Sequence, residues 1–263
     1  MIGLDVDWTD AARRGRRIGH AIEAHEVIGS TNDRARELLA DAAADGTVVV
    51  ADAQSAGRGR RDRTWYSPAG RSLSMSAVVR PRLGAHNAWQ LSLATALAVS
   101  EACDPVAPTW LKWPNDVVGA DDRKVGGILI ETVIEGDRVV GAVIGVGMNL
   151  DWRRGEMPDD VRDTATSLAD LGGQAVDRVA LLDRVLDGLS AEVGSLEGGR
   201  SPLHRYRTRC RTLGRRVDVS VGDRTISGTA IDLDPDGALV VETADGPRRI
   251  PNGEVQRVRS GAT

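Results

Sequence analysis

Three segments of the chain carry apolar residues at helical spacing, which predicts three helices. The first follows the capping side chain of Ser30 and should end near Gly46. The second follows Asn87, and polar residues interrupt it often enough to predict a buried helix rather than a membrane span. The apolar positions are 35, 38, 39 and 42, then the run 88–103, and then 181, 182, 185, 186 and 189.

Shorter segments rich in Val, Ile and Leu predict strands, and the last two of them flank a Glu-Gly-Asp turn at 135–137. Strands and helices in this order predict an α+β fold, a mixed sheet with helices packed on it. Two stretches without periodicity, a Gly/Arg loop at 54–63 and a polar segment at 153–166, are expected to be loops. The predicted strands are 47–53, 72–79, 108–113, 124–134 and 138–147.

The pattern changes after Gly198 and Gly199. Residues 215–259 contain only short β-like pieces separated by Gly-Asp, Pro-Asp-Gly, Asp-Gly and Asn-Gly turns. Tight turns at these intervals predict a small SH3-like barrel. We therefore expect a large domain over 1–210 and a C-terminal SH3-like domain over 211–263.

Composition is that of an ordinary globular protein, with 263 residues of which 41% are hydrophobic. The net charge of −4 gives no global reason to expect nucleic acid or a membrane surface as a partner. Two cysteines without metal spacing, and no signal segment, favour a reducing compartment, the cytoplasm. A basic run, Arg13, Arg14, Arg16 and Arg17, predicts a solvated helix face.

Lysine is nearly absent, since Lys and Arg total 34 and the lysines are Lys112 and Lys124 alone. A bias in the coding DNA replaces Lys by Arg wherever the two are interchangeable. They are not interchangeable where a compact ammonium is needed, so both lysines are candidate site residues.

Four motifs carry candidate chemistry. The loop 57–63 combines glycines, which allow close approach of the backbone, with arginines that grip anions, although such a loop is more often merely solvated. Residues 112–116 place an ammonium, an amide and a carboxylate around a Pro turn, and the alternative is an ordinary turn. Lys124 precedes a Gly-Gly pair that would admit a planar ligand, or only a β-bulge. Residues 145–149 end a strand and offer backbone and an amide.

Other chemistries are disfavoured. The four histidines lack ligand spacing, no Ser or Cys stands in a nucleophile elbow, and the chain has no Walker-type phosphate loop. What remains is the positioning of an anion against a nucleotide phosphate, with fixed cations stabilising the charge that develops.

Taken together, these motifs resemble the biotin protein ligases in order and spacing over about residues 26–260. The resemblance implies ATP-dependent attachment of biotin to a lysine of a biotin carboxyl carrier domain, through biotinyl-5'-AMP, with Mg²⁺ accompanying ATP. The motifs are Ser30-Thr31-Asn32, Gln54 with Gly57-Arg58-Gly59-Arg60-Arg61, Lys112-Trp113-Pro114-Asn115-Asp116, Lys124-Val125-Gly126-Gly127-Ile128-Leu129, Gly145-Val146-Gly147-Met148-Asn149 and Ala165-Thr166-Ser167-Leu168.

The resemblance also implies roles for individual residues. Catalytic cations would be Lys124, Arg58 and Arg60, and Asp116 would orient Mg²⁺ or accept a proton. The segments 55–66 and 153–166 correspond to loops that order over the ligands. Biotin would contact Ser30, Thr31, Asn32, Gln54, Gly57, Arg58, Gly59, Arg60, Lys124 and Gly127, and ATP would contact Arg58, Arg60, Arg63, Lys112, Asn115 and Asn149.

One position departs from the family pattern, Gly-Arg-Gly-Arg-Arg-Gly-Arg, because Asp62 stands where that pattern has Gly. The backbone there is either strained or held by pairing of Asp62 with Arg61 or Arg63, and we expect the substitution to be tolerated. Only 29 residues precede Ser30, too few for a winged-helix repressor domain, so operator binding is not expected.

Two other functions compete with this prediction. A lipoate or octanoate ligase shares the fold and the activation chemistry, but the arginine loop and residues 112–116 favour biotin. A nucleic-acid-binding protein would need stacking aromatics, and aromatic residues make up only 3% of the chain. We expect a monomer or a weak homodimer.

Overall fold

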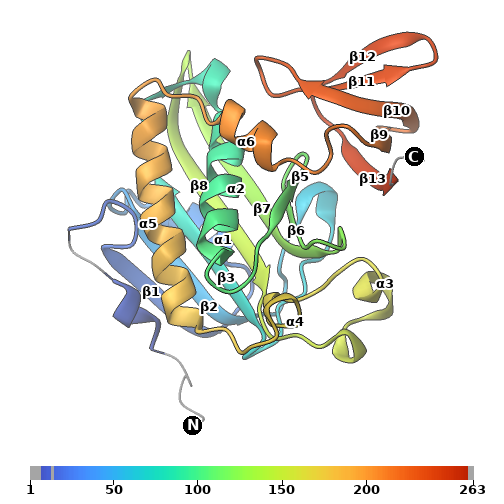
Figure 1. The fold of residues 1–263 in the computed structure, drawn as a ribbon. Helices are drawn as coiled ribbons and strands as arrows, with labels where there is room; N and C mark the ends of the chain where they lie inside the picture. Colours follow the sequence, from blue (N-terminus) through green and yellow to red (C-terminus); the bar gives the residue numbers. More distant parts are fainter. Residues whose placement is uncertain (1–6, 13–14, 260–263) are drawn as a thin grey trace.

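The structure, a computed structural model, describes residues 7–12 and 15–259. Within these residues the main body is one eight-stranded sheet with the strand order β1-β2-β3-β8-β7-β6-β5, and β4 pairs with β8 (Figure 1). β1 runs parallel to β2, and the other neighbours are antiparallel. The strands are β1 (Ala21–Ile28), β2 (Thr47–Gln54), β3 (Ser72–Val79), β4 (Leu83–Gly84), β5 (Trp110–Lys112), β6 (Asp116–Val118), β7 (Lys124–Glu135) and β8 (Arg138–Asn149).

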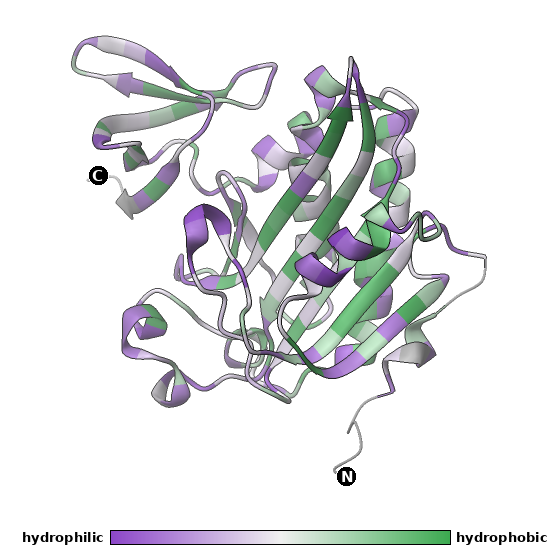
Figure 2. Ribbon diagram, turned by 180° about the vertical axis from the view of Figure 1, so that it is seen from behind, coloured by the Kyte–Doolittle hydropathy of each residue, from purple (hydrophilic) through white to green (hydrophobic). Residues whose placement is uncertain are grey.

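Helices cover both faces of this sheet. α2 (Gln90–Cys103) and α5 (Arg178–Glu197) pack against each other on the face that holds the larger hydrophobic cluster. α1 (Thr31–Ala40) crosses the opposite face over β2, β3 and β8 (Figure 2). The short helical segments are η1 (Trp8–Ala11), η2 (Arg60–Asp62), η3 (Ala85–Asn87), η4 (Arg154–Glu156), α3 (Asp159–Arg162), α4 (Leu168–Gly172) and α6 (Leu203–Arg209).

The alternation of side chains along β8 explains how one face of the sheet is left open. Ile144 and Met148 point into the larger cluster, whereas Val143 joins the smaller cluster beneath α1. Gly145 and Gly147 fall on the same face as Val143 and have no side chain to fill the space beyond the end of α1. The α1 face of the sheet therefore has room for a pocket.

The C-terminal part forms a five-stranded antiparallel sheet with the order β12-β11-β10-β9-β13. The predicted all-β, SH3-like unit is confirmed, although in the described residues the sheet stays open because β12 does not pair with β13. Trp113 anchors this sheet, since its indole Nε1 donates to the carbonyl of Gly237 at 3.1 Å. The strands are β9 (Arg216–Val221), β10 (Arg224–Leu233), β11 (Leu239–Thr243), β12 (Gly246–Ile250) and β13 (Glu254–Arg259).

Three expectations about elements need correction. The first helix ends at Ala40 rather than near Gly46, because Ala42 adopts a positive φ of 57°. The second begins at Gln90, since residues 85–87 form η3 and Asn87 does not cap it. The segment 153–166 contains η4 and α3 instead of being irregular throughout.

The basic run near the N-terminus is also not a solvated helix face where it can be described. Arg13 and Arg14 lie outside the described residues. Arg16 is 9% exposed, and its guanidinium lies 2.8 Å from Asp183 and 3.0 Å from Asp187 of α5. This arginine fastens the N-terminal segment to α5.

In the part of the chain that the structure describes, no helix combines the length and the apolar character needed to cross a bilayer.

Candidate active site

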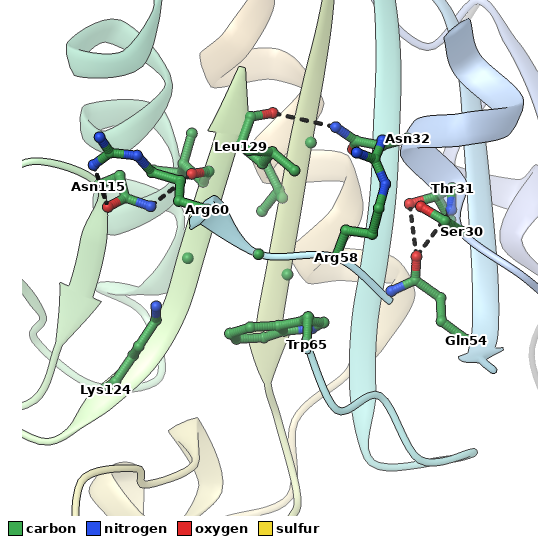
Figure 3. Close-up of a pocket in the computed structure, with 16 residues that line it drawn as sticks. Ser30, Thr31, Asn32, Gln54, Arg58, Arg60, Trp65, Asn115, Lys124 and Leu129 are labelled. Carbon is green, nitrogen blue, oxygen red and sulfur yellow. Dashed lines mark hydrogen bonds between the residues drawn. The ribbon is translucent and has the colours of Figure 1, made fainter. Parts of the chain in front are cut away.

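A pocket of about 450 Å³, including its open mouth, lies on the α1 face between the start of α1, the arginine loop 57–63 and strands β7 and β8 (Figure 3). The bare backbones of Gly145 and Gly147 make room for its walls. A Cβ at Gly147 would lie 2.5 Å from the Trp65 ring. The lining residues are Ser30, Thr31, Asn32, Gln54, Arg58, Gly59, Arg60, Trp65, Asn115, Lys124, Gly127, Ile128, Leu129, Gly145, Val146 and Gly147.

One wall of the pocket consists of hydroxyl and amide groups. Ser30 caps α1 through its hydroxyl, as expected, by accepting a hydrogen bond from the Asp33 N–H. The Gln54 side-chain oxygen accepts hydrogen bonds from the Thr31 N–H at 2.9 Å and from the Thr31 hydroxyl at 3.2 Å. Its amide nitrogen donates to Ser74 at 3.1 Å. These bonds fix each group against its neighbour, so the wall holds its hydrogen-bonding groups in set positions.

Lys124 lies on the far side of Trp65 from this wall (Figure 3). Its ammonium lies 2.6 Å from one oxygen of Asp116 and 5.5 Å from the centroid of the Trp65 ring. The Lys112 ammonium is 3.9 Å from the other oxygen of Asp116. Both lysines of the chain therefore meet at one carboxylate.

The arginine loop folds back on itself as a small hairpin. The Trp65 N–H donates to the Gly57 carbonyl at 2.9 Å, and the Gly59 N–H donates to the Arg63 carbonyl at 2.7 Å. Gly57 is required here, because a Cβ would lie 2.4 Å from the Trp65 carbonyl oxygen. The hairpin brings Arg58 and Arg60 to the pocket.

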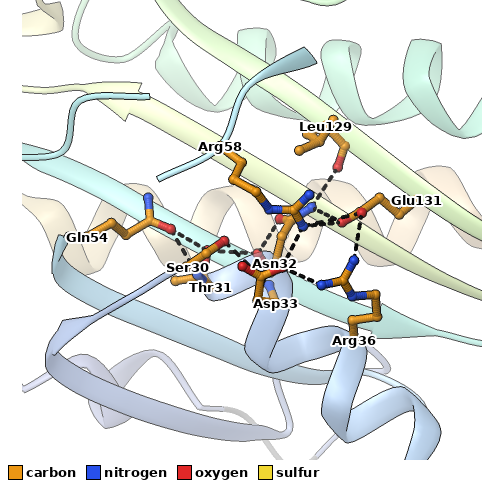
Figure 4. A network of polar contacts seen from close by, with 10 residues as sticks. Ser30, Thr31, Asn32, Asp33, Arg36, Gln54, Arg58, Leu129 and Glu131 are labelled. Carbon is orange, nitrogen blue, oxygen red and sulfur yellow. Dashed lines mark hydrogen bonds and ion pairs between the residues drawn. The ribbon is translucent and has the colours of Figure 1, made fainter. Parts of the chain in front are cut away.

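The two arginines that line the pocket have different partners. Arg60 donates to the side-chain oxygen of Asn115 at 3.2 Å and to Asn252 of the C-terminal sheet at 2.6 Å. Burial, assisted by the neighbouring charge of Arg61, lowers the pKa of Arg60. Arg58 instead lies 2.8 Å from Asp33 and 3.1 Å from Glu131 (Figure 4). Arg58 is thus held at the α1 end of the pocket, away from Lys124.

Asp62 and its neighbour Arg61 both have positive φ values, 58° and 55°. The loop at this position therefore has the left-handed backbone that glycine adopts at least cost. Arg61 and Arg63 both form ion pairs with Glu254 of β13.

Ten of the predicted site residues line the pocket, and five do not. Gly57, Arg63, Lys112 and Asp116 lie next to lining residues or to their partners. Asn149 is buried, and its amide nitrogen donates to the Thr166 carbonyl at 3.1 Å. The lining members of the predicted set are Ser30, Thr31, Asn32, Gln54, Arg58, Gly59, Arg60, Asn115, Lys124 and Gly127.

The described residues offer Asp116 no further side chains with which to surround a metal ion. No group of three or more His, Cys, Asp or Glu side chains suited to a metal occurs among residues 7–12 and 15–259. The Asp116 carboxylate is already balanced by two ammonium groups. A single carboxylate is nevertheless enough for Mg²⁺ that is carried mainly by phosphate oxygens.

Sequence reasoning did not assign roles to several groups at the pocket. Trp65 forms part of its lining, and its buried indole N–H has no hydrogen-bond partner in the described structure. Ser74 and Ser76 stand behind the polar wall. The sequence does contain a signal for Ser74 and Ser76. Serine alternates with apolar residues at 72, 74 and 76 within a strand, and buried hydroxyls need hydrogen-bond partners. No role was predicted for Glu131 either.

A mixed sheet with this pocket and a small C-terminal β-sheet defines a ligase of the biotin and lipoate type. Residues 24–149 match the family described as "Biotin/lipoate A/B protein ligase family", and residues 212–258 match "Biotin protein ligase C terminal domain". The chain belongs to the biotin protein ligase family, as its relatives show.

Among these relatives, "Biotin--[acetyl-CoA-carboxylase] ligase" of Mycobacterium tuberculosis is 36% identical over 246 residues, which cover 89% of each chain. "Bifunctional ligase/repressor BirA" of Bacillus subtilis is 32% identical over 243 residues, 91% of this chain and 74% of that protein. The solved structure of biotin protein ligase from Aquifex aeolicus in complex with biotin and ATP superimposes with a TM-score of 0.75 at 30% identity, covering 92% of this chain and 99% of that one. The predicted family and fold are confirmed.

Proposed function

We propose that this chain attaches biotin to a lysine of a biotin carboxyl carrier domain, using ATP. In the first step a carboxylate oxygen of biotin attacks the α-phosphorus of ATP, and the bond to the bridging oxygen of pyrophosphate breaks. In the second step the carrier amine attacks the carbonyl carbon of biotinyl-5'-AMP, an amide forms, and AMP leaves. The pocket supports this proposal, because a wall of hydroxyls and amides stands opposite an end that carries Lys124 and Arg60.

In this proposal the wall around Thr31 and Gln54 holds the ring of biotin, and its carboxylate points toward Lys124. Two anions must meet in the first step, so a fixed cation at their meeting point lowers their repulsion and stabilises the charge that develops. Lys124 is held for this task by Asp116 and Trp65. Arg60 and Asn115, which are hydrogen-bonded to each other, lie on the same side of the pocket as Lys124 (Figure 3), and we assign them as contacts for the phosphate and the nucleotide.

Arg58, Arg63, Lys112 and Asn149 remain proposed contacts of the ligands. Arg58 is bound to two carboxylates, so its proposed role requires it to leave them. Asp116 is the carboxylate next to Lys124, and we propose that it takes the proton released by the attacking amine. Alternatively, Asp116 would hold Mg²⁺, which would neutralise charge on the phosphates.

We further propose that the partner is the biotin carrier of an acetyl-CoA carboxylase, since two relatives carry names that state this specificity. The cytoplasm is the proposed location, which the two buried cysteines without a disulfide support. A division of the chain into domains over 1–210 and 211–263, and a monomer or weak homodimer without affinity for nucleic acid, complete the proposal.

Intact mass spectrometry tests the proposed function directly. Purified protein is incubated with ATP, Mg²⁺, biotin and a recombinant carrier domain, and the carrier should gain the mass of one biotin. A carrier with its acceptor lysine changed to Arg serves as the control. An unmodified wild-type carrier would refute the proposal.

A lipoate ligase is the second candidate, because the matched family description includes lipoate. Biotin and lipoate both end in a carboxylate but differ in their rings, so the polar wall discriminates between them. We expect biotin, and not lipoate, to raise the thermal midpoint of the protein. The reverse result would favour the second candidate.

A further inference from the structure

Glu131, on β7, stands behind the pocket wall and joins two of its residues. One oxygen of its carboxylate accepts a hydrogen bond from the Asn32 side-chain amide at 2.8 Å, and the same oxygen lies 3.1 Å from the Arg58 guanidinium. Arg36, one turn along α1, lies 3.6 Å from the other oxygen (Figure 4). Asn32 and Arg58 line the pocket, whereas Glu131 does not. Glu131 is thus placed to act through them.

Two acceptors decide which way the Asn32 amide faces, and the Glu131 carboxylate, at 2.8 Å, is nearer than the Leu129 carbonyl, at 3.5 Å. An ionised carboxylate only accepts hydrogen bonds, so Asn32 must turn its NH₂ group toward Glu131. Its oxygen then faces Ser76, whose hydroxyl lies 2.6 Å away. Asn32 is 5% exposed and Ser76 is fully buried, so water does not compete for these groups.

The orientation passes from Asn32 to Thr31. Ser76 has one hydroxyl proton, and the Asn32 oxygen can only accept, so the proton goes to Asn32. The Thr31 hydroxyl oxygen, at 2.8 Å, is the other acceptor within reach of the Ser76 hydroxyl, and it receives no proton from Ser76 once that proton is committed to Asn32. Thr31 donates its own proton to the Gln54 side-chain oxygen at 3.2 Å, so its oxygen keeps its lone pairs for the pocket.

We propose that Glu131 is a positioning residue for ligand binding. By fixing Asn32, it sets the direction of the hydrogen bonds along Asn32, Ser76 and Thr31, so that the wall presents acceptors to the N–H groups of a cyclic urea such as the ring of biotin. This inference rests on the proposed function and deepens it.

Asp33 provides a matched control. Its carboxylate also pairs with Arg58 and Arg36, at 2.8 and 2.5 Å, but Asn32 donates to Glu131. Glu131→Gln and Asp33→Asn therefore remove the same charge from the same pair of arginines. The two variants differ in whether the nearer partner of the Asn32 amide is still a group that can only accept a hydrogen bond.

Isothermal titration with biotin compares these variants with the wild type. Glu131→Gln should weaken biotin binding about tenfold, since it replaces a hydrogen bond to a charged group, and Asp33→Asn should change it less than about threefold. Equal losses in the two variants, or wild-type affinity in Glu131→Gln, would overturn the inference and leave the proposed function standing. Absence of biotin binding by the wild type would instead refute the proposed function.

A double-mutant cycle separates positioning from damage to the fold. In an Asn32→Ala background, Glu131→Gln should change biotin affinity less than about twofold, because Asn32 is the group through which it acts. A loss that arises from misfolding would persist in that background. A full additional loss therefore counts against the inference.

Discussion

At the scale of single residues, Lys124 shows why one cation of this arginine-rich chain is a lysine. Its ammonium fits between Asp116, at 2.6 Å, and the face of Trp65. Gly127 leaves the space beside it, since a Cβ there would lie 3.1 Å from the end of the lysine. A planar guanidinium is larger and directs its donors in a fixed fork, so it cannot reproduce this position.

Lys124→Arg should therefore lower kcat/KM for biotin transfer by about 100-fold, the size of effect expected when one fixed donor to a developing charge is misplaced. Initial rates with saturating carrier domain would measure it. Lys112→Arg is the control, because Lys112 lies farther from Asp116, at 3.9 Å, and is expected to retain more activity. Wild-type rates for Lys124→Arg would contradict the assignment.

Asp62 is a residue in a backbone conformation that suits glycine, with φ of 58°. Asp tolerates this region better than most residues, so the cost is at most about 1 kcal/mol. Asp62→Gly should relieve it but leave the loop contacts of Arg61 and Arg63 unchanged. We expect retention of biotinyl-5'-AMP to change less than tenfold, measured by release of labelled adenylate, and a tenfold or larger increase would show that Asp62 impairs loop closure.

At the scale of elements, bare backbone on β7 and β8 shapes the pocket. Gly145 lies under the Asn32 amide and Gly147 under the Trp65 ring, where added Cβ atoms would approach to 2.0 and 2.5 Å. Both glycines follow from strand periodicity, since they share a face with Val143. The sheet thus positions two side chains that come from elsewhere in the chain.

Gly147→Ala should push Trp65 out of its place and weaken biotin binding by about tenfold or more, because the ring is rigid and the strand backbone cannot give way. Titration calorimetry provides the measurement. Gly155→Ala serves as the control, since nothing lies within 4 Å of a Cβ at that position. Unchanged affinity in Gly147→Ala would mean that Trp65 does not contribute to the site.

The elements also show what the sequence can and cannot predict. β3 is predicted with its observed bounds because its apolar alternation is local information. β1 is not predicted. It lies at the edge of the sheet, and its sequence contains charged residues that hide the strand pattern. The resemblance places Thr31 and Gln54 among the expected biotin contacts, but it assigns no role to Glu131. Its function depends on which side chains meet it across the sheet, and no local pattern encodes that.

At the scale of the whole molecule, the C-terminal sheet reaches back to the arginine loop. Glu254 forms ion pairs with Arg61 and Arg63, and Asn252 accepts a hydrogen bond from Arg60. The loop and this sheet are separated by most of the sequence, and the contact joins the loop that brings Arg60 to the pocket to the C-terminal sheet. The position of the loop therefore depends on the C-terminal sheet.

Glu254→Gln should loosen this contact and expose the loop to proteolysis. Trypsin cleaves after arginine. The rate of cleavage after Arg61 and Arg63, measured by mass spectrometry, therefore reports how often the loop opens. We expect the rate to rise about threefold or more, in line with the loss of an ion-pair network worth less than 1 kcal/mol per pair. Glu242→Gln, an exposed carboxylate on β11, should leave the rate unchanged. Equal rates in the two variants would argue against the contact.

The meeting of both lysines at Asp116 has a consequence for the chemistry of amines on this enzyme. A mixed anhydride that escapes from the pocket reacts with free side-chain amines, and this chain has none apart from Lys112 and Lys124, which are 21% and 35% exposed and paired with a carboxylate. The protein should therefore be a poor acceptor of its own activated product. Incubation with ATP and biotin without a carrier is expected to leave Lys112 and Lys124 unacylated in a peptide map, and extensive acylation of either would contradict this. Any reagent that acylates lysine side chains would, by the same reasoning, find its targets in this chain only at Lys112 and Lys124.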